Sequence, residues 1–426
     1  MSKSHTVQSG DTLGKISTRY YGVFARWTEI VQANPQLSGR KTVADGSPVI
    51  FPGDVLIIPN TEEAPLPKKN AKTIVLDENA KKDLALFIDG KKLTGFTGYT
   101  VARAVDTFDA FSFSATWDSA NADLREAFRP FAYKNCNVFF DGDLIFSGTL
   151  LPAAPQVSDN SRTINLQGYP KCGVLGDSVL PDSLYPPEFS GLDLKQIAEN
   201  VCSPFGVGVK ITADIGAAFD KVEIAPDEKI FDFLKKLAEQ RGVFLSNDDD
   251  GSLLVWKPEE EEVSAVFKQG EIPFMSCSAQ FDGQKMFSHV TGFTKTEKDK
   301  ASEKFTYENK SLQKAGALRC FAKVIDDAAE GDIEAATKAM AGRMFASCVK
   351  YSLEVMGHRD KDGKLYRRNM SVSVFAPDAQ IYRETKFQVD EVEMTRSDSD
   401  GEKTKFSLVL PGARSGELPE AWPWEE

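Results

Sequence analysis

The segment Glu228–Val255 reads EKIFDFLKKLAEQRGVFLSNDDDGSLLV and changes its hydrophobic period halfway along. Its first apolar residues recur at helical spacing: Ile230, Phe233, Leu234 and Leu237. Asp227 is the expected N-cap of this helix, and Gly242 is its expected end. Beyond Gly242, two apolar runs flank Asp250-Gly251, which predicts a β-hairpin. A helix followed directly by a hairpin indicates a small α+β domain.

The sequence before this segment extends the same domain. In LDLKQIAENVC, residues Leu194, Ile197 and Val201 lie on one face of a second helix. The acidic run 259–262 then marks a boundary. We therefore expect the α+β domain to span residues 183–258.

Alternating strands flank the α+β domain on both sides. Upstream, DAFSFSATWD (109–118) has period two, and NVFFDGDLIFSGTL (137–150) reads as a hairpin across Asp141-Gly142. These runs predict a compact antiparallel barrel or sandwich over residues 83–182. Downstream, a helix and two hairpins, turning at 362–363 and 400–401, predict a second barrel over residues 259–415.

The first sixty residues have the order strand, helix, helix, strand. They contain GDTL (10–13), YYG (20–22), ANP (33–35) and PGDVLIIP (52–59), and in this wording they resemble the LysM domain. The resemblance predicts a LysM domain over residues 1–60, with Asp11 as the cap of its first helix. It also implies a glycan- or partner-binding groove between two loops, formed by Gly10, Asp11, Thr12, Ile50, Phe51, Pro52 and Gly53. Residues 61–82 are charged and contain two prolines, so we expect a linker there.

The body resembles the central hub family of contractile-tail baseplates, of the Mu, P2 and T4 type. The resemblance rests on the order and wording of three segments: 185–209, 228–255 and 387–411. It implies a mainly β fold in which an α+β insert separates two barrels like those of the tail tube. It also implies a homotrimer that forms a pseudo-sixfold ring between the tail tube and a threefold spike.

The composition excludes several other functions. The net charge of −12 argues against a phosphate-gripping surface, although DNA that slides past without specific binding remains compatible with it. Three isolated histidines and six scattered cysteines form no zinc or thiol-protease motif, and we expect reduced thiols. The NDDDG, DKDG and SDSDG segments lack the remaining ligands of a calcium loop. We therefore expect no catalytic residues, metal or cofactor, and no membrane span.

The tail, residues 416–426, carries Trp422 and Trp424. Two arrangements are open: the tryptophans fold back onto the second barrel, or they dock on a neighbouring subunit or the spike.

These observations predict a structural hub in the virion tail baseplate, assembled in the host cytoplasm. The expected partners are a spike protein, a tail-tube or tube-initiator protein, and baseplate wedge proteins reached through the LysM domain. The alternative is a LysM-targeted protein that binds or hydrolyses peptidoglycan during wall penetration.

Overall fold

The computed structural model describes residues 3–8, 11–21, 27–41, 47–59, 73–75, 84–94, 96–140, 142–294, 303–314, 316–325, 333–414 and 422–425. The N-terminal unit consists of β1 (Lys3–Thr6), α1 (Leu13–Tyr21), α2 (Trp27–Ala33), the 3-10 helix η2 (Pro35–Leu37) and β2 (Val55–Ile58). β1 and β2 pair antiparallel, as expected for βααβ. The apolar faces of both helices pack on Leu56 and Ile58 of β2 in a small separate core.

The first β region follows the expected linker. Its elements are β3 (Thr73–Val75), β4 (Leu84–Ile88), β5 (Lys91–Thr94), β6 (Phe96–Ala104), β7 (Ala110–Thr116), α3 (Ala122–Ala127), β8 (Asn135–Phe140), β9 (Asp143–Leu150), β10 (Ala154–Val157) and β11 (Arg162–Pro170). β3 lies inside the stretch expected to be a linker, and it pairs parallel with β5. β8 and β9 pair as the predicted hairpin.

The α+β insert has its own core. Its elements are η3 (Lys171–Gly173), α4 (Val174–Asp177), η4 (Asp182–Leu184), β12 (Glu188–Leu192), α5 (Leu194–Cys202), η5 (Ser203–Phe205), β13 (Val209–Ile211), β14 (Phe219–Glu223), α6 (Ile230–Gln240), β15 (Phe244–Asn247) and β16 (Leu253–Trp256). Both predicted helices and the β15–β16 hairpin are present.

The expected cap of α6 is wrong. Lys229 is the N-cap residue and provides no side-chain cap, so Asp227 lies outside the helix. The residue that caps by its side chain is Asp193, which forms a capping box with Gln196 at the start of α5.

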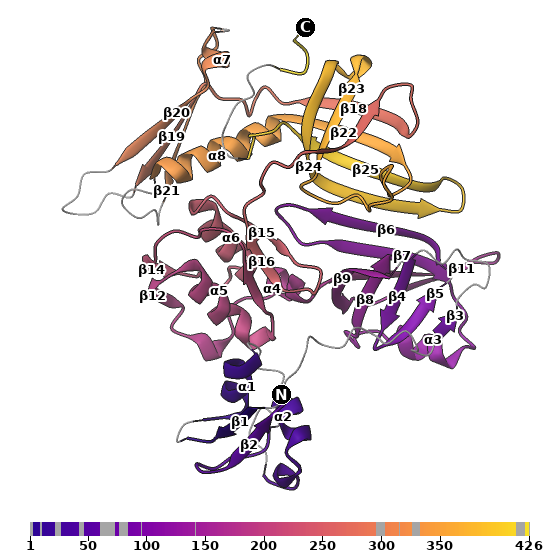
Figure 1. The fold of residues 1–426 in the computed structure, drawn as a ribbon, viewed down its shortest axis with the longest axis vertical. Coiled ribbons are helices and arrows are strands. Elements are labelled where there is room, and N and C mark those ends of the chain that lie inside the picture. The colour runs from indigo at the N-terminus through magenta and orange to yellow at the C-terminus, as the bar shows by residue number, and fades with distance from the viewer. Residues whose placement is uncertain are drawn as a thin grey trace.

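The last region consists of β17 (Val263–Lys268), β18 (Phe274–Phe281), β19 (His289–Thr294), β20 (Lys304–Glu308), α7 (Lys310–Lys314), β21 (Cys320–Ile325), α8 (Ile333–Cys348), β22 (Val349–Met356), β23 (Ser371–Ala376), η6 (Pro377–Ala379), β24 (Ile381–Ser397) and β25 (Gly401–Val409). β19–β21 form a separate three-stranded sheet that packs on α8, and this arm projects from the body (Figure 1). β24 and β25 form the predicted hairpin at Asp400-Gly401. The predicted hairpin across Asp362-Gly363 is wrong, because β22 pairs with β18 and β25 whereas β23 pairs with β17 and β24.

The two β regions share one sheet. Among the described residues we find a 15-stranded sheet and no closed barrel. Its main path runs β18-β22-β25-β24-β6-β7-β11-β9-β8-β4-β5-β3. The join is the antiparallel pair of β6 with β24, where Figure 1 shows the purple and yellow halves meeting. The expectation of two separate barrels therefore needs correction, since long hairpins from each half continue the pairing across the boundary.

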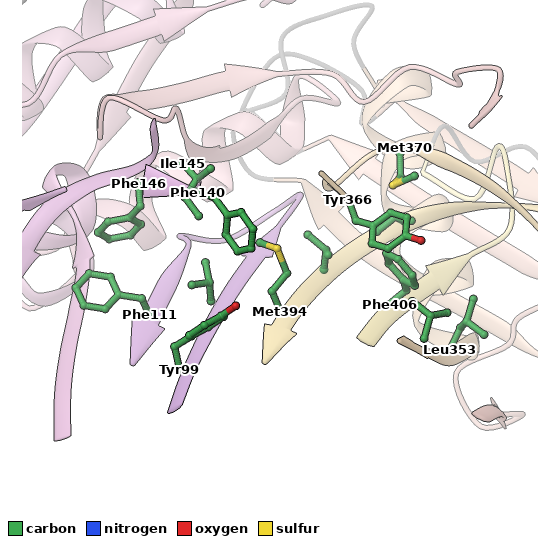
Figure 2. Packing of buried hydrophobic residues seen from close by; sticks show 14 of the residues in the cluster. Tyr99, Phe111, Phe140, Ile145, Phe146, Leu353, Tyr366, Met370, Met394 and Phe406 are labelled. Atoms are coloured by element: carbon green, nitrogen blue, oxygen red, sulfur yellow. The ribbon is translucent and has the colours of Figure 1, made fainter. Parts of the chain in front are cut away.

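The core is also shared. One cluster of buried apolar side chains runs from Leu84 to Trp422, and Figure 2 shows Tyr99 and Phe140 of the first half beside Met394 of the second. His358 is 2% exposed and lies between the halves, 3.1 Å from the Tyr99 hydroxyl and 2.9 Å from Thr404 Oγ1. Because Thr404 donates to the Gly357 carbonyl, it accepts from Nδ1–H of His358, and Nε2 accepts from Tyr99. Burial lowers the pKa of His358 to about 4.

Candidate functional site

The expected LysM groove begins with the loop before α1. Gly10 lies outside the described residues, while Asp11 and Thr12 are described. The Thr12 hydroxyl accepts a hydrogen bond from the Lys15 amide (3.2 Å) and caps the helix, so the expected cap at Asp11 is wrong. Asp11 turns back and accepts from the Gln8 amide (2.9 Å) and from His5 Nε2 (2.9 Å). Both hydrogen bonds lower the pKa of Asp11, and the bond from the Gln8 amide has the larger effect.

The second loop of the groove is a tight turn before β2. The Asp54 amide donates to the Phe51 carbonyl (3.0 Å), and Gly53 takes a φ of 97°, which favours glycine. The Gly53 amide donates to the Val7 carbonyl (2.9 Å) and the Val7 amide donates to the Asp54 carbonyl (2.8 Å). The structure thus brings this loop against the end of β1, beside the loop that holds Asp11.

The groove presents an aromatic ring next to a cation. Phe51 is 58% exposed, and the Arg40 guanidinium lies 5.5 Å from its ring centroid. Arg40 also makes a two-pronged ion pair with Asp54, at 2.5 and 3.1 Å, which lowers the pKa of Asp54. An exposed ring with a fixed cation suits stacking on a sugar face or packing against a protein.

The C-terminal tryptophans pack on the body, as in the first of the two expected arrangements. Trp422 is 9% exposed, stacks on Trp424 with centroids 4.9 Å apart, and lies 5.5 Å from the Phe345 ring. Trp424 meets Phe281 edge-on at 5.1 Å. The Tyr382 amide donates to the Pro423 carbonyl (3.0 Å), which ties the tail to β24.

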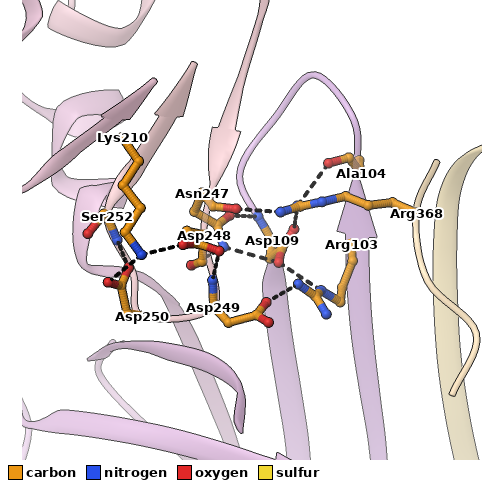
Figure 3. Close-up of polar contacts among 10 residues, drawn as sticks. All are labelled: Arg103, Ala104, Asp109, Lys210, Asn247, Asp248, Asp249, Asp250, Ser252 and Arg368. Atoms are coloured by element: carbon orange, nitrogen blue, oxygen red, sulfur yellow. Dashed lines mark hydrogen bonds and ion pairs between the residues drawn. The ribbon is translucent and has the colours of Figure 1, made fainter. Parts of the chain in front are cut away.

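A buried polar junction connects the insert to both β regions (Figure 3). Asp109, 1% exposed, lies at its centre and accepts from Arg103 Nε (3.0 Å) and from Arg368 (2.5 Å). Its amide also donates to the side chain of Asn247 (2.7 Å). Arg103 comes from β6, Asn247 from β15 and Arg368 from the loop before β23, so one carboxylate joins three parts of the fold.

The NDDDG hairpin is the insert's side of this junction. Arg368 donates to the Asn247 carbonyl, and Arg103 donates to Asp249. Burial lowers the pKa of Arg368 and raises that of Asp249. Gly251 fits against the Ser147 carbonyl so closely that a Cβ would come within 2.3 Å of it. Asp249 of this hairpin therefore joins the insert to β6, whereas Asp248 and Asp250 pair with Lys210 inside the insert. Among the described residues no group of three or more acids, histidines or cysteines is placed to bind a metal ion.

No sequence motif indicates this junction. Asp109 and Arg368 are 259 positions apart, so no short motif contains its members. One sequence signal does point to the junction. Arg103 lies on the same buried face of β6 as Tyr99 and Val101. A charged residue in the apolar phase of a strand indicates a buried ion pair.

The outward face of the sheet is polar across the boundary between the halves. The strands from β7 to β18 place small hydroxyl side chains on this face: Ser112, Ser114, Thr100, Thr395, Ser407, Ser352 and Ser278. Its charged residues are three acids and three bases: Glu354, Glu391, Glu393, Lys350, Lys403 and Lys405. On one side the face ends at β18, which pairs only with β22 among the described strands; on the other side β11 is followed by the short strand β10 and by β9, through which the sheet continues.

Family models match two parts of the chain. Residues 172–257 match the family "Baseplate hub protein gp44-like, second domain", and residues 5–59 match the LysM domain. The chain is 23% identical over 338 residues to the baseplate hub protein gp44 of Escherichia phage Mu, covering 76% of this chain and 87% of that protein.

Solved structures show a similar fold. A 43 kDa tail protein of prophage MuSo2 from Shewanella oneidensis is 22% identical, with a TM-score of 0.66 over 78% of this chain and 100% of that one. A tail protein of Neisseria meningitidis is 19% identical, with a TM-score of 0.66 over 78% and 98%. Within the described residues, no helix is long and apolar enough to cross a membrane. The chain thus contains a LysM domain followed by a body with a domain of the gp44-like baseplate hub family.

Proposed function

We propose that this protein is the structural hub of a phage tail baseplate, and that three copies form a ring between the tail tube and the spike. The observation that carries the proposal is the polar sheet face that runs from β7 to β18. A wide face of serine, threonine and paired charges suits the wall of a water-filled channel, whereas the opposite face is the apolar core. The similarity to the Mu hub protein supports the same role.

The two β regions supply the symmetry of the ring. Each contributes one long hairpin to the channel face: β6–β7 from the first half and β24–β25 from the second. Three chains then present six similar hairpins, which matches a sixfold tube above and a threefold spike below. The halves act as tube-like units even though their strands are joined in one sheet.

The charges of the channel face bear on how DNA passes. This face carries three glutamates and three lysines, and Glu393 of β24, Lys405 of β25 and Glu354 of β22 alternate in sign across the strands. Glu393 and Glu354 both lie opposite Lys405, and the Lys403 ammonium lies 4.0 Å from Glu354 and 3.8 Å from Asp400. These two lysines therefore have carboxylates beside them that compete with phosphates. A charge-balanced lining lets DNA slide without specific binding.

The LysM domain serves as a docking module toward neighbouring baseplate proteins. Val55 and Ile57 share the exposed face of β2, and Phe51 is exposed in the preceding turn, so the domain offers apolar side chains that a protein neighbour would cover. The solvent-facing ring of Phe51 beside Arg40 also favours a second candidate, the binding of peptidoglycan. A pull-down of the full chain on peptidoglycan, compared with Phe51→Ala, separates them: retention that depends on Phe51 supports the wall ligand, and no retention supports the protein neighbour.

Light scattering tests the ring. One chain has a mass of 46.9 kDa, and the expected particle has three times that mass. A structural role without catalysis agrees with the descriptions of the similar proteins. As a virion component, the hub would be found in purified tails after assembly in the host cytoplasm.

A further inference from the structure

One corner of the first β region combines backbone strain with exposed aromatic rings. Phe131 and Tyr133 have φ angles of 58° and 45°, in the left-handed region that non-glycine residues avoid. Their side chains are 73% and 55% exposed. Strained backbone that holds large apolar groups in water indicates an interaction site, because neither feature helps the isolated fold. We call residues 129–133 the aromatic knob.

The conformation of the knob is held by its neighbours. The Leu150 amide donates to the Lys134 carbonyl (2.8 Å), which fixes the end of the loop to β9. Lys134 also bonds Glu126 at 2.9 Å. The remaining charge at the tip is Arg129, which is exposed and contributes to the lowered pKa of Glu126. The knob therefore presents two rings and a cation.

A hollow with the complementary character lies at the start of β18. It has a volume of about 490 Å³ and includes Ile272 and Met275, which are 84% and 40% exposed. Glu271 and Asp378 are the charged residues of its lining, and within the described part of the chain no lysine or arginine lines it. An apolar hollow edged by acids suits an aromatic knob that carries an arginine.

The sheet register places the knob and the hollow at opposite ends of one line across the channel face. Gln167 lies opposite Ser112, and the line continues through Thr100, Thr395, Lys403 and Met356. The Met356 amide donates to the Pro273 carbonyl (2.9 Å), beside the hollow. At the other end, Gly168 pairs with Leu150, which holds the knob. The register thus places the two surfaces beside the two ends of this line.

We propose that the aromatic knob of one copy seats in the Ile272 hollow of the next copy, which makes this contact the heterologous interface of the ring. The inference rests on the proposed function, because it needs copies that meet edge to edge. A contact between two different surfaces, repeated around a threefold axis, closes a finite ring. Ordering of Phe131 and Tyr133 before assembly lowers the entropy cost of association.

The test measures the dissociation constant of the trimer by sedimentation for the full chain and its variants. Phe131→Asn with Tyr133→Asn removes both rings while keeping residues that tolerate a positive φ. We expect the dissociation constant of the trimer to increase at least about tenfold. Leu318→Asn is the matched control, since Leu318 is 78% exposed in the β19–β21 arm, and it leaves the trimer unchanged.

A charge exchange tests the pairing itself. Arg129→Glu and Glu271→Arg each weaken the trimer, and the combined variant recovers most of the loss if these side chains meet. Melting temperatures near that of the wild type verify that each variant is folded. A knob variant that associates as the wild type does, or a combined variant without recovery, overturns this contact while the ring stands. A wild-type chain that stays monomeric at its highest soluble concentration overturns the ring and this contact together.

Discussion

The LysM domain and the β body hold their charged side chains in different ways. In the LysM domain, Arg40 pairs with Asp54, 14 positions away, and both side chains are partly exposed. In the body, Asp109 joins Arg103 and Arg368 across up to 259 positions, with every member nearly buried. A module built from local contacts keeps its fold wherever it is attached. A body held by contacts between segments that are far apart in sequence folds only when all of these segments come into contact.

The largest expected effect comes from the centre of the body. Asp109→Ala leaves Arg103 and Arg368 buried without their carboxylate, and we expect a loss of about 3–5 kcal/mol in the free energy of unfolding. Urea denaturation measures it. Asp220→Ala, on the exposed surface of β14, is the control and costs less than about 0.5 kcal/mol. Hydrogen exchange of the β1 and β2 amides stays unchanged, and its acceleration would contradict the independence of the LysM domain.

The C-terminal tryptophans provide the next effect. Trp422→Ala removes a nearly buried ring from its contacts with Phe345 and Trp424, and we expect a loss of about 3 kcal/mol in unfolding free energy. Trp424→Ala costs less, because Trp424 is only partly buried. If both variants keep wild-type stability but fail to assemble, the tail docks on a neighbouring subunit instead.

His358 provides a pH dependence confined to the body. Its folded pKa of about 4 lies below the ordinary 6.5, so between these values the unfolded state binds a proton that the folded state does not. Stability is therefore present above pH 6.5 and is lost as the pH falls through this window, by about 2–3 kcal/mol. Denaturation at a series of pH values measures the slope, which His358→Gln reduces. An equal slope in both proteins would show that other groups cause it.

The smallest effect lies in the LysM domain. Arg40→Met removes the partly exposed pair with Asp54, and we expect a loss of about 0.5–1 kcal/mol that shrinks in high salt. Thermal melting of the full chain, followed through hydrogen exchange of β2, measures it. A loss comparable to that of Asp109→Ala would contradict the contrast between the two regions.

The same contrast explains what the sequence could predict. The LysM order, α5, α6 and the hairpins at 250–251 and 400–401 follow from local periods and turn residues, and the structure contains them. The pairing of β6 with β24 and the junction at Asp109 join residues that are hundreds of positions apart, and neither leaves a local pattern. The strands expected to pair across Asp362-Gly363 do not pair with each other, because β22 pairs with β18 and β25 whereas β23 pairs with β17 and with the next strand, β24.

The knob was missed for another reason. The residues RPFAYK (129–134) have no turn glycine, so the sequence does not indicate the left-handed angles at Phe131 and Tyr133. The positive φ angles are seen only in the folded structure, where the loop lies between α3 and β8 and the Leu150 amide of β9 holds the Lys134 carbonyl. The exposed aromatic residues of this loop indicate an interface between copies only when the hollow at β18 is considered with them.

The most direct test of the account is a reconstruction of the assembled full chain by electron cryo-microscopy. We expect a threefold ring of three chains whose central hole is lined by the face that carries Ser352, Glu393 and Lys405. A ring in which this face points outward, or an assembly without a central hole, would contradict the proposed hub.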